Sequence, residues 1–231
     1  MDLTYLLVLV VTLALGAGSQ FLIKSTYKKW SQVPISTQLT GAEVARNMLD
    51  ANGLTHVTIQ KIPGIEGDLS DHFDPRNNVV SLSESVHDRA TVGATAVACH
   101  ECGHAVQHAR GYAPAKLRGS LVPVVNLASN SWMLVLMAGI FMLTQAIPGA
   151  TQLIWLAIIL YGAVILFQVV TLPVEFDATS RGLAYIRSNP AVTAQESGGA
   201  KSVLRAAALT YVAAALSSLL YLLYLLTMVR R

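Results

Sequence analysis

The chain has 231 residues, of which 53% are hydrophobic and only 13% are charged, and its formal net charge is +3. A soluble domain carries roughly 25% charged residues, so this composition argues against an ordinary water-soluble globule, and the high apolar content excludes intrinsic disorder. No run of basic residues with interleaved aromatics points to nucleic acid. The two cysteines, Cys99 and Cys102, are too few for the disulfide framework of a secreted domain. The composition therefore indicates a membrane protein.

Four stretches are long and apolar enough to cross the hydrocarbon core of a bilayer as helices, which takes about 20 residues. They are Leu3–Ile23, Leu121–Ile147, Leu153–Leu172 and Val203–Val229. Pro148-Gly149 separates the second stretch from the third, and such a pair favours a tight turn. These two spans are therefore predicted to form a hairpin, which returns the chain to the face of the membrane from which it entered.

The distribution of basic residues predicts which face that is. Lysines follow the first stretch instead of preceding it, which favours an uncleaved anchor over a secretory signal peptide. Basic loops stay cytoplasmic, and segments 24–120 and 173–202 hold nearly all of the Lys and Arg. Only Arg230 and Arg231, after the fourth span, fall on the opposite side. We expect a multi-pass protein of the cell membrane whose polar region faces the cytoplasm.

That polar region has the pattern of a small α+β unit. A helix is predicted from residue 39 to residue 49, with Thr40 as its cap. Residues 57–62 alternate like a strand, and residues 79–82 follow a turn as a second strand. Small and apolar residues then resume helical spacing over residues 88–109.

This last predicted helix carries the sequence His-Glu-Cys-Gly-His at residues 100–104. On a helix, His100 and His104 lie about 40° apart around the axis and about 6 Å along it, so both imidazoles can bind one zinc ion. Glu101 can reach a metal-bound water without ligating the metal, as a general base must. The alternative is that both histidines are ordinary polar positions of an amphipathic helix.

A catalytic zinc site needs a third protein ligand. Glu175 is the favoured candidate, because it follows the third span by three residues and the hairpin returns it to the face of the two histidines. Its alternative role is a helix-start carboxylate stabilised by the helix dipole. Asp177 ranks second, since it would point about 200° away on a helix that begins here. Arg110 stands where the metzincin pattern has its third His, and His108, about 12 Å along the axis from His100, is too far to bind the same ion.

Four segments carry a family resemblance that extends over nearly the whole chain. They are His72–Arg76, His100–His108, Gly111–Arg118 and Pro173–Ala178. With them the sequence resembles the YugP-like family of membrane zinc metallopeptidases and, more distantly, the HtpX-type membrane gluzincins. The resemblance implies His100, His104 and Glu175 as zinc ligands and Glu101 as the catalytic acid/base. HtpX-type enzymes have an Asp four residues after the ligand Glu, where this chain has Thr179, so the contacts around its ligands must differ.

We therefore predict a mainly α membrane protein: four transmembrane helices and a small α+β, zincin-like cytoplasmic domain with an HExxH helix. Its predicted parts are a transmembrane anchor (1–23), a cytoplasmic catalytic region (24–120), a transmembrane hairpin (121–172), a cytoplasmic segment with the third ligand (173–202) and a transmembrane helix with its tail (203–231). The predicted function is a zinc-dependent endopeptidase with one Zn²⁺ per chain. It would act on membrane-associated proteins or peptides at the cytoplasmic surface of the bilayer, and nucleic acid is not an expected partner.

Further residues are expected to bind substrate or to support the ligands. Strand 79–82 is predicted to be a sheet edge that pairs with extended substrate. The candidates for these supporting roles are Val79, Val80, His72, His108 and Thr179.

The CxxC formed by Cys99 and Cys102 leaves other functions open. A thioredoxin-type CxxC begins a helix after a strand, whereas this one lies within a predicted helix. Cys99 would point about 100° away from His100, so a zinc site made of both cysteines and both histidines needs the helix to break. Cysteines within a helix are more commonly small, buried residues of the apolar core. A thiol-redox or structural-zinc membrane protein, or a non-catalytic membrane scaffold, is the alternative.

Overall fold

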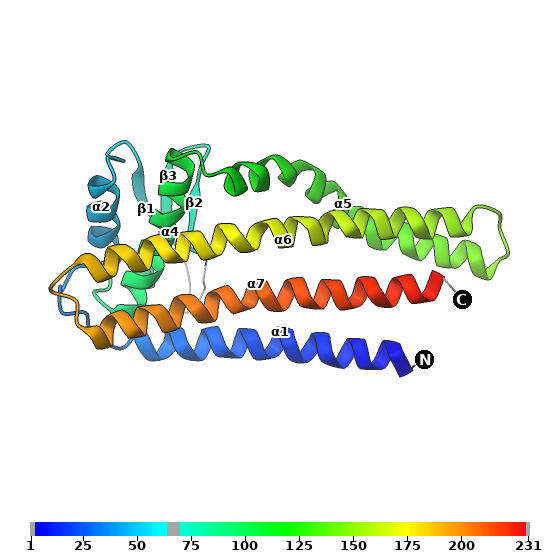
Figure 1. Cartoon of the computed structure of the whole chain (residues 1–231), viewed down its shortest axis with the longest axis horizontal. Helices are drawn as coiled ribbons and strands as arrows, with labels where there is room; N and C mark the ends of the chain where they lie inside the picture. The colour runs from blue at the N-terminus through cyan, green and yellow to red at the C-terminus, as the bar shows by residue number, and fades with distance from the viewer. Residues whose placement is uncertain (1–2, 64–69, 230–231) are drawn as a thin grey trace. The chain divides into compact units, whose positions relative to one another are not determined.

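The computed structural model describes residues 3–63 and 70–229, so the predicted positions of Arg230 and Arg231 lie outside the described residues. Helices dominate this part of the chain, and three strands form one small sheet (Figure 1). The elements are α1 (Leu3–Trp30), α2 (Gly41–Ala51), β1 (Thr58–Ile62), β2 (His72–Asp74), β3 (Val79–Ser83), α3 (Glu84–His87), α4 (Val92–Ala109), α5 (Ala113–Thr144), α6 (Ala150–Ser188) and α7 (Ala194–Val229).

The chain divides into two compact units. One unit consists of Met1–Gly18, Leu117–Leu172 and Tyr211–Arg231, and the other consists of Ser19–Lys116 and Pro173–Thr210. Each unit has its own cluster of buried apolar side chains. We call the first the helical unit and the second the mixed unit, because the mixed unit contains the sheet.

Among the described residues, four helices are long and apolar enough to cross a membrane, namely α1, α5, α6 and residues Ala194–Thr227 of α7. They have 28, 32, 39 and 34 residues, more than the roughly 20 that a hydrocarbon core requires. Each contains most or all of one predicted span. The structure thus confirms the prediction of four apolar helices, but it extends them beyond the predicted limits.

The largest extension is that of α6, which runs on from Leu172 to Ser188 without a break. A new helix near Pro173 was expected, and that expectation is wrong. Pro173 lies inside α6, where proline removes one backbone hydrogen bond. The residues around it hold the helix in place, since Thr171, Val174 and Glu175 are all buried.

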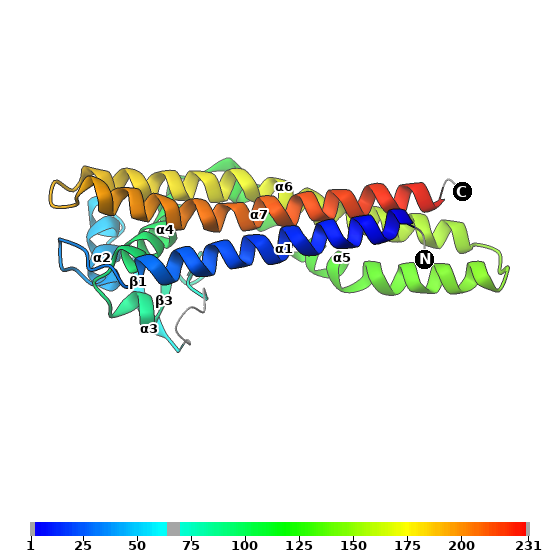
Figure 2. The same cartoon turned by 90° about the horizontal axis from the view of Figure 1, so that it is seen from below.

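The helical unit packs around contacts between α5, α6 and α7. Leu136 of α5, Ile154 of α6 and Leu225 of α7 belong to its buried apolar cluster. The beginning of α1 lies beside the end of α7 (Figures 1 and 2), where the Tyr5 and Tyr224 rings are 5.4 Å apart. Apolar side chains that face away from these contacts are exposed on all four helices, as a lipid-facing surface requires.

The sheet of the mixed unit has the order β1-β3-β2, with β1 parallel and β2 antiparallel to β3. The prediction that residues 79–82 form a sheet edge is therefore wrong, because β3 is the central strand. The turn before it closes a hairpin, which pairs Asp74 with Val79. A strand between two neighbours has no free backbone groups for a substrate, so Val79 and Val80 cannot bind peptide in the predicted way.

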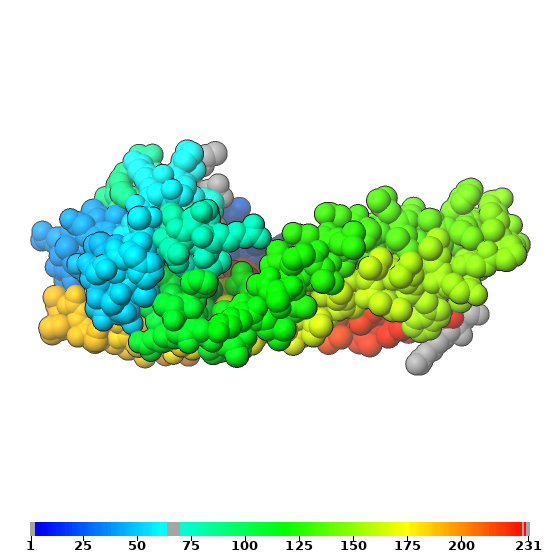
Figure 3. Space-filling view, turned by 90° about the horizontal axis from the view of Figure 1, so that it is seen from above, coloured from blue at the N-terminus to red at the C-terminus, as the bar shows by residue number. Residues whose placement is uncertain are grey.

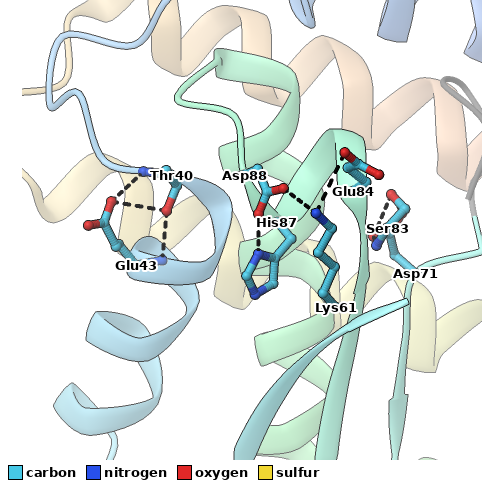
Figure 4. A network of polar contacts seen from close by, with 8 residues as sticks. All are labelled: Thr40, Glu43, Lys61, Asp71, Ser83, Glu84, His87 and Asp88. Carbon is cyan, nitrogen blue, oxygen red and sulfur yellow. Dashed lines mark hydrogen bonds and ion pairs between the residues drawn. The ribbon is translucent and has the colours of Figure 1, made fainter. Parts of the chain in front are cut away.

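Polar contacts fix the outer elements of the mixed unit, and residues of α2 lie at its surface in Figure 3. The predicted cap is present: Thr40 accepts a hydrogen bond from the Glu43 N–H, and Glu43 accepts one from the Thr40 N–H. Lys61 of β1 forms an ion pair with Asp88 beyond α3 (Figure 4). Asp71 accepts hydrogen bonds from the backbone N–H and the hydroxyl of Ser83.

Two glycines let α4 and α6 approach each other closely. A Cβ added to Gly103 would lie 2.5 Å from the carbonyl oxygen of Ala178, and one added to Gly182 would lie 3.0 Å from the carbonyl oxygen of Cys99. Such separations are well inside van der Waals contact. The absence of a side chain at these two positions therefore sets the distance between the helices.

We expect Gly103→Ala to destabilise the protein by about 1–3 kcal/mol, the usual cost of overpacking, because the new methyl group meets backbone that has nowhere to move. Thermal unfolding in detergent would measure the effect. Gly198→Ala in α7 is the matched control, because a Cβ there meets nothing within 4 Å. Equal unfolding temperatures for the two variants would contradict this account of the contact between α4 and α6.

Candidate metal centre

The structure brings together three residues that the sequence analysis predicted as ligands. His100 and His104 lie one turn apart on α4, and Glu175 faces them from α6. Glu175 Oε2 is 3.2 Å from His100 Nε2 and 3.6 Å from His104 Nε2. One ligand atom from each residue lies within 4.8 Å of the other two, and among the described residues these three alone form such a group.

This arrangement fits a zinc ion. Tetrahedral zinc binds imidazole nitrogen and carboxylate oxygen at about 2.0–2.2 Å, which places neighbouring ligand atoms about 3.3 Å apart. The separations from Glu175 Oε2 to the two histidine nitrogens bracket that value. Two imidazoles and one carboxylate are also the ligand set of known hydrolytic zinc sites, with the fourth position left for water or substrate.

Glu175 reaches this position because of its place along α6. It is only 2% exposed, and it lies on the helix stripe that also buries Thr171 and Ala178. A buried carboxylate needs compensating charge or hydrogen bonds, and His100 Nε2 provides a hydrogen bond at 3.2 Å. Because Glu175 sits well inside α6, the alternative of a helix-start carboxylate is wrong.

Asp177, the second choice for the third ligand, does not join the group. Its carboxylate accepts hydrogen bonds from the Gln107 side-chain amide at 2.8 Å and from Arg181 Nε at 2.6 Å. Two residues beyond Glu175, it projects from a different side of the helix. Asp177 thus contacts a neighbour of the ligands, and not the ligand atoms themselves.

Each histidine has a partner on its outer ring nitrogen. Thr179 Oγ1 lies 3.3 Å from His100 Nδ1, and Gln107 Oε1 lies 3.0 Å from His104 Nδ1. Metal-binding histidines commonly donate their other ring N–H to such an acceptor. Thr179, which replaces the expected Asp, therefore still contacts a ligand histidine.

Glu101 is buried beside the ligands, with 8% exposure. Burial raises the pKa of this carboxyl above its usual value; the histidines at positions 100 and 104 oppose the shift, and the carboxylates of Asp71 and Glu175 add to it. A carboxyl group with a raised pKa is a stronger base than an ordinary carboxylate, as a group that takes and returns a proton should be.

The remaining predicted residues lie outside the ligand group. His72 is exposed on β2, where its Nδ1 contacts the Ser70 carbonyl oxygen at 2.9 Å. His108 is also exposed, and its ring lies 5.8 Å from that of Phe73. As expected from the helix geometry, His108 is not among the residues that could share the ion.

The two cysteines take no part in this group. Both are free thiols with 0% exposure, and Cys102 Sγ contacts the Ala45 carbonyl oxygen of α2 at 3.5 Å. Burial raises the pKa of both thiols, which disfavours the thiolate that redox chemistry and zinc binding need. The structure supports the interpretation of both cysteines as small buried residues of the apolar core. It does not support a thiol-redox or a thiolate zinc site.

Sequence reasoning missed three residues around the site. Gln107 is 1% exposed between α4 and α6, Arg181 pairs with Asp177, and Asp71 influences Glu101 from the start of β2. The available signal was a polar side chain, Gln107, three residues after a predicted ligand on an otherwise apolar helix face.

The ligand set and the apolar helices define a class, that of membrane proteins with a candidate mononuclear metal centre. Residues 5–230 match the model of a family described as "Putative neutral zinc metallopeptidase", and the chain belongs to this family. A relative from Bacillus subtilis (strain 168), described as "Putative membrane protease YugP", is 43% identical over 219 residues, which cover 95% of this chain and 93% of the relative. No solved structure matches the chain.

We expect the protein purified in detergent to hold about one zinc per chain and to lose it in the His104→Ala and Glu175→Ala variants, since two ligands bind zinc far less well than three. Mass spectrometry of the metal content would measure this. The control is Cys99→Ala combined with Cys102→Ala, which removes the thiols and should leave the zinc in place. Zinc lost only with the cysteines would establish a thiolate site instead.

Proposed function

We propose that this chain is a membrane-bound, zinc-dependent endopeptidase of the gluzincin type, in which an HExxH helix of a zincin-like domain is completed by a Glu. The observation that carries the proposal is the convergence of His100, His104 and Glu175 from α4 and α6, with Glu101 buried next to the first ligand. The family description and the relative's name both support zinc peptidase chemistry.

In this mechanism His100, His104 and Glu175 hold the ion. Zinc bound there would polarise a peptide carbonyl and lower the pKa of its bound water toward neutrality. Thr179 and Gln107 orient the two imidazoles through their outer nitrogens. Glu175 supplies a negative charge that partly offsets that of the ion.

Glu101 is the proposed general base and acid. Its carboxylate would accept a proton from the attacking water and then donate it to the nitrogen of the leaving amine. The burial that raises the pKa of Glu101 favours this exchange, because a carboxyl of ordinary acidity is a weak base toward water. It also limits competing access of bulk water to the carboxylate.

The proposed substrates are proteins or peptides close to the membrane surface. Glu175 follows directly on the apolar run of α6, whose most apolar window has a mean hydropathy of 2.6. The basic residues of segments 24–120 and 173–202 favour a cytoplasmic position for the catalytic residues. Substrates in or next to the bilayer would reach such a site most easily.

We expect Glu101→Gln to lower the rate of peptide-bond cleavage by about 10²–10⁴-fold, the usual contribution of general acid–base catalysis, while zinc content stays unchanged. Cleavage of an unfolded, fluorescently labelled protein by the detergent-purified enzyme would measure the rate. Glu84→Gln, at an exposed position, is the matched control and should keep full activity. Zinc binding without any cleavage by the wild type would instead favour a structural zinc.

The proposed orientation has its own test. We expect a cysteine at Ala51, exposed at the end of α2, to react with a membrane-impermeant maleimide in inside-out vesicles but not in intact cells. A cysteine at Gln145, exposed in the turn between α5 and α6, should show the reverse. The native thiols are buried and should stay unlabelled. Reaction of Ala51→Cys in intact cells would place the site on the other face.

A further inference from the structure

We propose that Gln107 is a positioning residue that fixes the tautomer of His104, and that Asp177 and Arg181 of α6 hold the Gln107 amide in the orientation that this requires. The inference rests on the proposed zinc site, in which His104 is a ligand. It goes beyond the orienting contact described above, because it says which nitrogen of His104 carries a proton and what holds the Gln107 amide in place.

The orientation of the Gln107 amide follows from its neighbours. Its nitrogen, Nε2, lies 2.7 Å from the Val174 carbonyl oxygen and 2.8 Å from Asp177 Oδ2. Both atoms are hydrogen-bond acceptors only, so each needs a donor, and the –NH₂ group offers two. The reversed amide would place an oxygen against two oxygens. Nε2 therefore faces α6, and Oε1 faces His104.

The proton on His104 follows from that orientation. Gln107 Oε1, 3.0 Å from His104 Nδ1, can only accept a hydrogen bond. Nδ1 must then carry a proton and donate it. In the neutral imidazole this leaves the lone pair on Nε2, and Nε2 is the nitrogen that lies 3.6 Å from Glu175 Oε2. The free lone pair thus points to the position of the metal.

Arg181 makes the arrangement stable. Its guanidinium contacts both carboxylate oxygens of Asp177, through Nε at 2.6 Å and through the terminal Nη2 at 3.3 Å. Because Arg181 lies one turn after Asp177 on α6, the pair is held by the helix, and the carboxylate stays turned toward Gln107. The Tyr112 ring, 5.9 Å from the Arg181 guanidinium carbon, covers its other side.

The helix that orients Gln107, α6, also carries the third ligand, Glu175. Val174 and Asp177 flank Glu175 in sequence, so the two acceptors that orient Gln107 are placed by the turn of α6 that places Glu175. The position of His104 on α4 and that of Glu175 on α6 are therefore set by one network.

Gln107→Leu tests the proposal, because leucine has a similar volume but accepts no hydrogen bond. We expect zinc affinity to fall about 10–100-fold, the usual effect of removing an outer partner of a metal ligand. Competition with a zinc-binding dye would measure the affinity, independently of any peptidase activity. In the zinc-free wild type, nitrogen NMR of ¹⁵N-labelled histidine should also show His104 protonated at Nδ1, with the signal assigned by its loss in His104→Ala.

Two further variants separate positioning from a general loss of stability. Ser36→Ala removes a part-buried hydrogen bond to Glu196 in the same unit and touches no histidine, so its zinc affinity should equal that of the wild type. Asp177→Ala removes one of the two acceptors of the Gln107 amide and touches no histidine, so it should lower zinc affinity, but by less than Gln107→Leu.

Wild-type affinity in Gln107→Leu, or a loss no larger than that of Ser36→Ala, would overturn the proposal while leaving the zinc site intact. An unchanged zinc affinity in Asp177→Ala would also count against it. If the wild type bound no zinc through His104, the proposed function itself would fail, and the metal content of the His104→Ala variant distinguishes that outcome.

Discussion

The close contact between α4 and α6 is the constraint on which the candidate site depends. No single element holds all three ligands: α4 supplies two imidazoles, and α6 supplies the carboxylate. With ligand bonds near 2 Å, an extra ångström between the helices would move Glu175 out of reach of the ion. Gly103 and Gly182 remove the side chains that would otherwise hold the helices apart. The spacer within the HExxH motif is thus a packing position as well as a gap between ligands.

The close contact between α4 and α6 also explains why polar groups around the site are buried. Packing two helices so closely buries Gln107, Glu101 and Glu175, and unpaired polar groups there would each cost about 1–3 kcal/mol. Gln107 uses all three of its contacts, with His104, Val174 and Asp177. The hydrogen bonds that offset the cost of burial are the ones that orient a ligand.

The features of the fold and the site that could be predicted from the sequence are those set by residues close together in the chain. Helical spacing placed His100 and His104 on one face, apolar runs marked the four long helices, and Thr40 with Glu43 marked the start of α2. Contacts between segments that are distant in the sequence could not be predicted from such local patterns. The alternation of residues 79–82 does not say how many neighbours a strand has, and the central position of β3 depends on β1 and β2 together.

Glu175 falls between these cases. The hairpin argument brought it to the two histidines, but its place well inside α6 was not predicted, because a new helix was expected to begin near Pro173. The interpretation of Asp177 shows the same limit. Its angle relative to Glu175 was predictable, whereas its partners, Gln107 from α4 and Arg181 from a later turn, emerge only from tertiary packing.

The contact of Glu175 with both imidazoles has a consequence for how the protein is made. A buried carboxylate without a partner would oppose folding strongly, so a site completed only by metal would delay folding until metal arrived. Here His100 Nε2, 3.2 Å away, donates a hydrogen bond to the carboxylate. Glu175 therefore has a partner within the protein itself, so the packing of α4 against α6 does not depend on a bound ion to offset the burial of this carboxylate.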